Sequence, residues 1–290
     1  MSKKIFLYFI AILLLLNFFC WQEVFNLVKN GYILKVYFLD VGQGDSIFIE
    51  TPQKHQILID GGPDSIVLEK LQKIMPATDR TIDLVILTHP EKDHMQGLIE
   101  VLQRYSVDYI LWTGIIRDSP EYQKWISVLA EEQNQGAKII TAEFGQAITA
   151  GGVKIDILHP FEKLVGQEME DSNDSSVVSR LFFGENVFLF TGDITTKTEQ
   201  ELMEEKMELR ADILKVGHHG SKYSTAIEFL ENISPEFAII SSGKNSYGHP
   251  TSEVLQRLKN FGIKVLRTDL DGDIKIISDG KNIIINSLGK

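Results

Sequence analysis

The chain has 290 residues, of which 43% are hydrophobic and 24% are charged, and its formal net charge at pH 7 is −11. These proportions are ordinary for a globular protein and exclude a disordered chain, and the length allows one large domain or two small ones. The negative charge argues against static nucleic-acid binding, but an acidic enzyme can act on phosphodiesters if bound cations supply a local positive field. Because Cys20 is the single cysteine, the sequence excludes an intrachain disulfide and a cysteine-based zinc site.

The N-terminal segment is strongly apolar. Lys3 and Lys4 precede a run from Ile5 to Trp21 that only Asn17 interrupts. As a helix this run is about 25 Å long, near the lower limit of ~17–25 residues for crossing a bilayer. No small-residue cleavage site follows it, so the sequence favours an uncleaved anchor over a cleaved signal peptide and secretion, and the lysines favour a cytoplasmic N-terminus. We expect an anchor over residues 1–22 and a linker over residues 23–31.

Short apolar runs and helical patterns then alternate along the chain. Strands are expected at Tyr37–Leu39, Ser46–Ile49, Gln56–Ile59, Leu84–Leu87, Tyr109–Trp112, Lys138–Ile140, Val153–Leu158, Val187–Phe190, Ile213–Val216, Phe237–Ile240 and Lys264–Arg267. Helices are expected at Ser65–Met75, Met95–Tyr105, Glu121–Gln133, Lys197–Met207, Ala226–Leu230 and Ser252–Phe261, with an exposed acidic loop at Glu162–Asp174. This alternation predicts an α/β fold whose sheets are covered by helices, with a single domain over residues 32–290.

The segment from Thr88 to His94 carries the sharpest chemical signal. It follows a predicted buried strand and offers four potential metal ligands within six residues: His89, Glu91, Asp93 and His94. Imidazole and carboxylate together suit Zn²⁺ or Mn²⁺. The alternative is a polar helix entrance, with Asp93 as a cap and solvated histidines.

Further polar residues follow other predicted strands. His159 follows one strand, Asp193 follows another, and His218 and His219 follow a third. Strand ends are where α/β proteins build their sites, so these residues are expected to converge. His55 is interpreted as a turn residue of a hairpin.

In this order, the motifs resemble those of the metallo-β-lactamase superfamily. The resemblance narrows to the hydrolase domain of ComEC DNA-uptake proteins through four further segments: Leu39-Asp40-Val41-Gly42-Gln43-Gly44-Asp45-Ser46, Leu58-Ile59-Asp60-Gly61-Gly62, Leu214-Lys215-Val216-Gly217-His218-His219-Gly220-Ser221 and Asn245-Ser246-Tyr247-Gly248-His249-Pro250. It covers about residues 33 to 286 and implies an αββα sandwich of two mixed sheets flanked by helices, here after one transmembrane helix. Two departures are evident: Glu91 stands where the superfamily usually has histidine, which favours Mn²⁺ or mixed occupancy, and ComEC proteins have many transmembrane helices.

The resemblance also implies a ligand set for two divalent ions. His89, Glu91, His159 and Asp193 would hold the first ion. Asp93, His94, Asp193 and one of His218 or His219 would hold the second, with Asp193 bridging. Two ions can activate a water and stabilise a leaving oxygen, which gives Asp93 and Asp193 catalytic roles.

Three more residues have roles that the sequence leaves open. Asp60 is expected to orient a metal ligand, or else to be a turn residue before two glycines. Lys215 is expected to face a substrate phosphate, or else to form a surface salt bridge. His249 is expected to donate to phosphate or protonate a leaving group, or else to be a turn histidine.

The function that this set implies is a phosphodiesterase or nuclease outside the cytoplasmic membrane, with DNA as a substrate and the DNA-uptake machinery as a partner. The alternatives are a hydrolase of a cell-wall phosphoester, such as phosphocholine or teichoic acid, and a non-catalytic metal-binding accessory subunit of an uptake complex. Glu91 and the ComEC-like segments disfavour a β-lactamase. The sequence leaves the substrate, the metal and the oligomeric state open.

Overall fold

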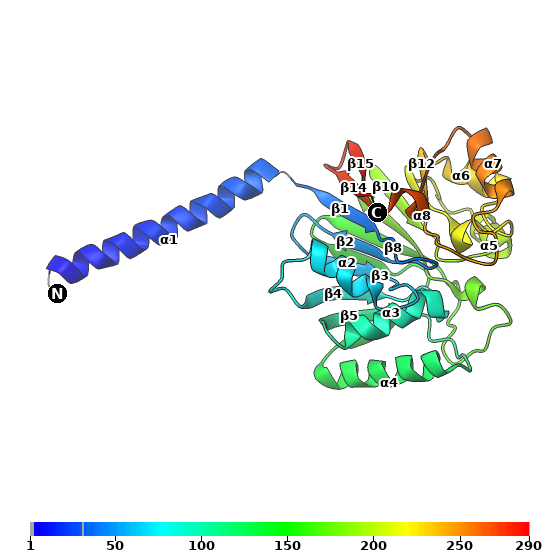
Figure 1. Ribbon diagram of the computed structural model, residues 1–290, viewed down its shortest axis with the longest axis horizontal. Coiled ribbons are helices and arrows are strands. Elements are labelled where there is room, and N and C mark those ends of the chain that lie inside the picture. The colour runs from blue at the N-terminus through cyan, green and yellow to red at the C-terminus, as the bar shows by residue number, and fades with distance from the viewer. Residues whose placement is uncertain (1–2, 31, 290) are drawn as a thin grey trace. The chain divides into compact units, whose positions relative to one another are not determined.

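The computed structural model describes residues 3–30 and 32–289 and divides the chain into two compact units, Met1–Ile33 and Leu34–Lys290 (Figure 1). The first unit is helix α1, Lys3–Asn30. Within the described residues, its part Lys3–Gln22 is the one helical segment long and apolar enough to cross a membrane. Residues 23–30, which belong to the expected linker, continue the helix because no glycine or proline interrupts them. Residues 1, 2, 31 and 290, where several expected limits fall, lie outside the described residues.

The second unit contains two mixed sheets. The first sheet has eight strands in the order β15-β14-β1-β2-β3-β4-β5-β6, and the second has seven in the order β13-β12-β11-β10-β9-β8-β7. The strands of the first sheet are β1 Leu34–Phe38, β2 Ile47–Glu50, β3 Gln56–Ile59, β4 Thr81–Ile86, β5 Ser106–Trp112, β6 Lys138–Thr141, β14 Ile274–Ser278 and β15 Ile283–Ser287. Those of the second are β7 Ala147–Ala150, β8 Val153–His159, β9 Val178–Phe183, β10 Asn186–Phe190, β11 Ile213–Lys215, β12 Phe237–Ile240 and β13 Lys264–Arg267.

Helices pack on the outer face of each sheet. The first sheet carries α2 Ile66–Ile74, α3 Lys92–Leu102 and α4 Pro120–Gln135, and the second carries α5 Thr196–Glu204, α6 Ile227–Ile233 and α7 Ser252–Asn260. A short helix α8, Thr268–Asp271, and two 3-10 helices, Ser172–Ser175 and Gly217–Gly220, lie in connecting segments. The unit is therefore an αββα sandwich, which confirms the expected fold class.

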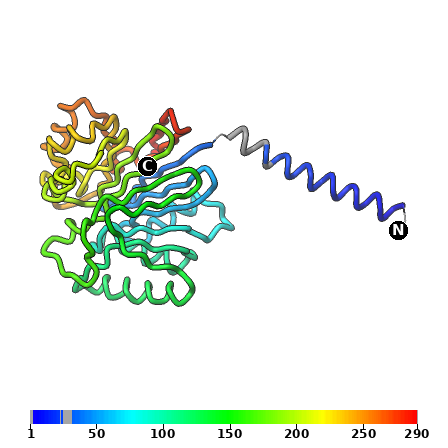
Figure 2. The backbone as a smooth tube through the Cα atoms, turned by 180° about the vertical axis from the view of Figure 1, so that it is seen from behind, coloured from blue at the N-terminus to red at the C-terminus, as the bar shows by residue number. Residues whose placement is uncertain are grey.

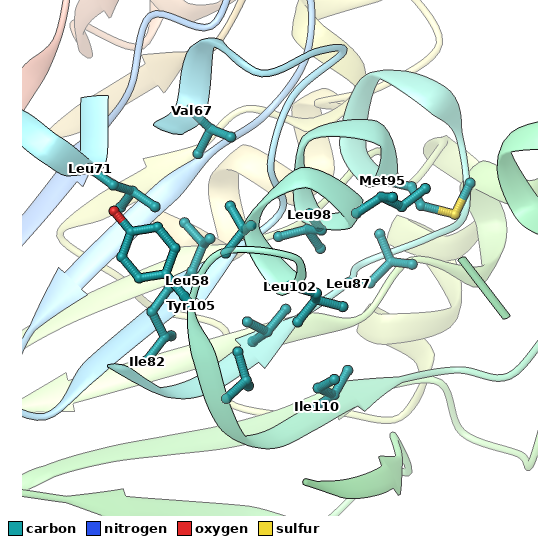
Figure 3. Close-up of a cluster of buried hydrophobic side chains, with 14 of the residues drawn as sticks. Leu58, Val67, Leu71, Ile82, Leu87, Met95, Leu98, Leu102, Tyr105 and Ile110 are labelled. Carbon is teal, nitrogen blue, oxygen red and sulfur yellow. The ribbon is translucent and has the colours of Figure 1, made fainter. Parts of the chain in front are cut away.

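The sandwich has three apolar layers because most central strands are buried on both faces. In β3, Leu58 points toward the helices, whereas Ile57 and Ile59 point between the sheets. Figure 3 shows Leu58 among side chains of α2 and α3, including Leu71 and Leu98. Adjacent residues of β3 thus pack into two different apolar layers, because successive side chains of a strand point to opposite faces of the sheet.

The ends of the domain meet at one edge of the first sheet. Figure 2 shows the last strands, in red, returning beside β1, and β14 pairs antiparallel with β1 from Leu34↔Ser278 to Phe38↔Ile274. The sequence patterns predict neither these two final strands nor β7 and β9. Each of the four has a partner distant in the sequence or belongs to an edge hairpin, so its identity depends on tertiary pairing.

Candidate metal centre

The candidate residues lie at the ends of strands that run parallel. β3, β4, β5 and β6 are mutually parallel in the first sheet, as are β10, β11, β12 and β13 in the second. Their carboxyl ends therefore meet along one edge of the sandwich, where Asp60, His89 and Asp193 follow β3, β4 and β10. The loop between β1 and β2 reaches the same edge, since Phe38 pairs with Ile47.

Close packing places the first turn of α3 at this edge. Gly97 of α3 lies against Gly61, and a Cβ atom on Gly97 would come within 1.9 Å of the Gly61 carbonyl oxygen. The Gly61 amide donates to the carbonyl oxygen of His94 at 2.8 Å. The helix begins at Lys92, with Glu91 as its N-cap, rather than at Met95 as expected. Asp93 and His94 consequently project from its first turn.

Three overlapping groups of side chains could hold metal ions. Within each group, one donor atom from every residue lies within 4.8 Å of the others, and the groups are His89, His94 and Asp193; Asp93, His94 and His219; and Asp45, Asp193 and His219. Asp193 Oδ2 lies 3.3 Å from His94 Nε2 and 3.1 Å from His219 Nε2. Asp193 therefore occupies the centre of the cluster. A fourth group joins Asp45 and Asp60 to His94.

Four histidines, His89, His94, His159 and His219, share one hydrogen-bonding pattern. Nδ1 faces an oxygen in each case: Asp60 Oδ2 for His94 at 2.8 Å, the Ser241 carbonyl for His219 at 2.9 Å, the Ser176 carbonyl for His159 at 2.8 Å, and Thr88 Oγ1 for His89 at 3.0 Å. Nε2 of His89 and Nε2 of His94 are buried and have no hydrogen-bond partner among the described residues. This pattern leaves the Nε2 atoms of His89 and His94 available to a metal, so the donor set fits divalent ions such as Zn²⁺ or Mn²⁺.

Burial and neighbouring charges set the ionisation of the cluster. Burial alone would raise the pKa of Asp193, but His219, Lys215 and His94 outweigh it and hold that pKa well below its ordinary value. Burial would lower the pKa of His94 and His219, yet Asp193 raises both well above normal. Burial lowers the pKa of His89 to about 3. The central carboxylate is thus held ionised and His89 neutral.

Asp60 hydrogen-bonds to His94 of the cluster without being the cluster's central ligand. It accepts hydrogen bonds from the Thr88 amide at 2.8 Å, from Thr88 Oγ1 at 2.7 Å and from His94 Nδ1 at 2.8 Å. Burial raises its pKa despite the opposing charge of His94. Its contacts orient His94, which differs from the alternative of a plain turn residue.

Two expected ligands of the first ion lie outside the donor groups found among the described residues. The Glu91 carboxylate is held by Arg117 Nη2 at 2.5 Å and by Ser172 Oγ, so its position at the edge of the cluster is set by these partners. His159 is buried beside Phe161, with its Nδ1 bonded to Ser176. Ser176 Oγ in turn accepts from the Asp193 amide at 3.0 Å, so His159 lies near the cluster without joining it.

Of the two adjacent histidines after β11, only one belongs to the donor groups of the described residues. His219 enters two of the donor groups and His218 enters none of those formed by the described residues. Both residues have left-handed backbone angles, with φ of 47° for His218 and 52° for His219. Such consecutive left-handed residues are strained and turn the two rings in different directions. His218 packs instead against His249, with ring centroids 5.5 Å apart.

Lys215 is neither exposed to a substrate nor in a surface salt bridge. Its side chain is fully buried and its Nζ pairs with Asp45 and, at 3.2 Å, with Asp193 Oδ1. Both roles expected from the sequence are therefore wrong. Asp45 itself was not singled out as a site residue, although it stands in the quoted glycine-rich segment. Aspartate after Gly-Gln-Gly in a loop at the strand edge is the signal that could have identified it.

A pocket opens over the cluster. Its volume is about 210 Å³, and it is lined by Gln43, Glu91, Asp93, Asn173, Asp193, His218, His219, Tyr247 and His249. His249 is half-buried, its Nδ1 has no hydrogen-bond partner among the described residues, and burial lowers its pKa. Tyr247 is 75% exposed and stacks on His249, with ring centroids 5.9 Å apart and an interplanar angle of 29°. Tyr247, His249 and His218 therefore form an aromatic wall from the rim to the interior.

Known proteins resemble this chain over most of its length. The model of the metallo-beta-lactamase superfamily matches residues 39–244. ComE operon protein 3 of Bacillus subtilis (strain 168) is 33% identical over an alignment of 259 residues, and the match covers 83% of this chain and 32% of that protein. Competence protein ComA of Neisseria gonorrhoeae is 32% identical over an alignment of 267 residues, and the match covers 91% of this chain and 35% of that protein. The chain thus spans about a third of the length of these curated relatives.

A solved structure shows the same fold at low identity. CmlA, a diiron beta-hydroxylase from Streptomyces venezuelae, is 13% identical with a TM-score of 0.52, over 83% of this chain and 53% of that chain. The family model covers most of the chain, and two curated relatives are more than 30% identical over more than 80% of it. The chain therefore belongs to the metallo-beta-lactamase superfamily.

Proposed function

We propose that this protein is a membrane-anchored, metal-dependent phosphodiesterase that cleaves nucleic acid outside the cytoplasmic membrane. The observation that carries the proposal is the central position of Asp193, whose Oδ2 lies within 3.3 Å of Nε2 of both His94 and His219 beneath an open pocket. A carboxylate so placed suits a bridge between two divalent ions. When bound, two such ions stabilise charge on the phosphoryl oxygens and activate water.

The ligand roles follow from the donor groups. His89 would hold the first ion, and Asp93, His94 and His219 would hold the second. Asp193, which shares one group with His89 and another with His219, would be a ligand of both. His159 remains a candidate for the first ion because its Nδ1 is already bonded to a carbonyl. Glu91 is left out, since Arg117 and Ser172 hold its carboxylate.

His249 is proposed to supply the leaving-group proton. It lines the pocket beside His219, and its ring is held between Tyr247 and His218. A half-buried imidazole at the pocket wall can hold a proton near the reacting phosphate and deliver it to the departing oxygen. Lys215 takes no part in this step because it is fully buried.

The location rests on α1 and on the relatives. Lys3 and Lys4 precede the apolar segment, which supports a cytoplasmic N-terminus and an external hydrolase unit. The name of one relative, competence protein ComA of Neisseria gonorrhoeae, refers to competence. This supports a role for the chain in DNA uptake, in which cleavage of DNA would accompany its transport by other proteins.

The exposed ring of Tyr247 supports a substrate with planar groups. One face of this ring contacts His249, and the side chain is 75% exposed at the pocket rim. Bases of single-stranded nucleic acid stack on such aromatic side chains with ~1–3 kcal/mol per base. A choline group needs several aromatic rings around it, and Tyr247 is the one Phe, Tyr or Trp among the residues lining this pocket.

Replacing Tyr247 with alanine should therefore raise KM for a single-stranded oligonucleotide by roughly 5- to 100-fold, with little change in kcat, because a stacking contact is lost. Tyr247→Phe should retain the wild-type KM because it keeps the ring. Glycerophosphocholine, which has no aromatic ring, serves as the comparison substrate. If Tyr247→Ala impairs both substrates equally, the ring has no stacking role.

A substrate panel tests the proposed function as a whole. Purified full-length protein in detergent is loaded with Mn²⁺ or Zn²⁺ and assayed on single-stranded oligonucleotides, glycerophosphocholine, a teichoic-acid polymer and a β-lactam. We expect turnover of the oligonucleotides above the others. Preferred turnover of a cell-wall phosphoester would replace the nucleic-acid assignment, and metal binding without any turnover would indicate an accessory subunit.

A further inference from the structure

Lys215 is the one lysine that the structure buries within its described residues. It ends β11, and its ammonium donates to the Gly192 carbonyl at 2.9 Å and to Asp193 Oδ1 at 3.2 Å, and it also pairs with Asp45 Oδ2. An ammonium has three donors, so these three oxygens use all of them. Lys215 therefore has no donor left for a substrate.

Asp45 lies between Lys215 and the Nδ1 atoms of two histidines, His94 and His219. Its Oδ2 lies 3.8 Å from His94 Nδ1, and its Oδ1 lies 3.5 Å from His219 Nδ1. Its side chain is 2% exposed, and the loop between β1 and β2 delivers it to the cluster. Asp45 thus stands on the side of the imidazoles opposite to their Nε2 atoms.

The two carboxylate oxygens of Asp193 therefore have different partners. Oδ1 faces the Lys215 ammonium, whereas Oδ2 faces His94 Nε2 at 3.3 Å and His219 Nε2 at 3.1 Å. A carboxylate with one oxygen occupied by an ammonium offers a single oxygen to metal. Without that contact the group can rotate and chelate one ion with both oxygens, at the expense of the other ion.

We propose that Lys215 and Asp45 form a positioning pair that holds Asp193 with only Oδ2 turned toward the metal cluster. The pair acts through Asp193 and touches no substrate. This inference rests on the proposed function, because it assumes that Asp193 binds metal. On this proposal, the buried ion pair between Lys215 and Asp45 keeps two metal positions available instead of one.

Two variants that conserve the net charge of the wild type separate positioning from charge. Lys215→Met combined with Asp45→Asn removes one positive and one negative charge together with the donor to Asp193. Lys215→Arg keeps both the charge and the donors. Lys35→Met is the control for loss of a lysine ion pair, since Glu50 keeps Lys54 as a partner.

The measurement is titration of full-length, metal-free protein in detergent with Co²⁺, followed by its visible absorption, with folding checked by thermal unfolding. We expect wild type, Lys35→Met and Lys215→Arg to bind two ions. The Met/Asn variant should bind the first ion normally and the second at least 10-fold more weakly, within the ~10–100-fold range for residues that orient ligands, with a changed absorption band.

Other results of the Co²⁺ titration would overturn the positioning role or the proposed function. Wild-type affinity and absorption for the second ion in the Met/Asn variant would overturn the positioning role, and so would an equal loss in Lys215→Arg. If the Met/Asn variant does not fold, Asp45→Asn alone decides, because it removes the anionic partner of Lys215 and keeps the lysine. Wild-type affinity for the second ion and an unchanged absorption band in that variant would overturn the role. Failure of wild type to bind Co²⁺ would instead contradict the proposed function.

Discussion

Asp193→Ala should reduce oligonucleotide hydrolysis to the uncatalysed background and leave less than one divalent ion per chain. Asp193 belongs to two of the donor groups and its Oδ2 approaches both His94 and His219, so its removal takes a ligand from both metal positions. Residues that act as a unit lose function together rather than additively. Among the described residues, Asp193 is the one carboxylate that lies within 3.3 Å of Nε2 of both histidines.

Metal content and turnover are to be measured on the same samples of this variant. Asp108→Ala is the matched control, because Asp108 is an exposed carboxylate on β5. The control should keep wild-type metal content and activity. If Asp193→Ala retains two ions and hydrolyses the oligonucleotide at the wild-type rate, Asp193 is not the bridging ligand.

The second large effect is expected at the histidine pair after β11. His219→Ala should lose the second ion and lower kcat by roughly 10²–10³-fold, because a bound ion contributes several kcal/mol to stabilising the transition state. His218→Ala should keep both ions, since His218 enters no donor group among the described residues. The two positions share left-handed backbone angles, so the conformational cost of alanine is similar at both.

Elemental analysis of the two variants, with single-turnover kinetics at saturating metal, separates these expectations. Loss of metal in His218→Ala together with its retention in His219→Ala would reverse the assignment. Equal loss in both variants would indicate that the turn, rather than one ring, is needed for binding.

Strand positions were predictable where the apolar runs are short and bounded by turn residues. The expected limits of β3, β12 and β13 agree with the structure, and each of these strands is flanked by glycine, proline or charged residues in the sequence. β9 follows a serine-rich segment, and β14 and β15 lie after the last motif. β9 pairs with β8, β14 pairs with β1, and β15 pairs with β14, and no local pattern contains these pairings.

The types of the site residues were predictable, but their partners were not. Lys215 stands next to the histidine segment, yet its surroundings are set by Asp45, which lies 170 residues earlier in the chain. Similarly, Glu91 has the spacing of a ligand, and the Arg117 and Ser172 side chains that hold it come from two different loops. The choice between His218 and His219 depends on backbone angles that the residue types do not reveal.

We propose that the cluster around Asp193 holds two divalent ions and that these ions make the protein a phosphodiesterase. The most direct measurement counts ions bound per chain while Mn²⁺ or Zn²⁺ is added to metal-free, full-length protein, and follows oligonucleotide hydrolysis in the same samples. We predict that two ions bind per chain and that hydrolysis appears as the second position fills. A chain that stays metal-free, or one that binds two ions and cleaves no phosphodiester, would contradict the claim.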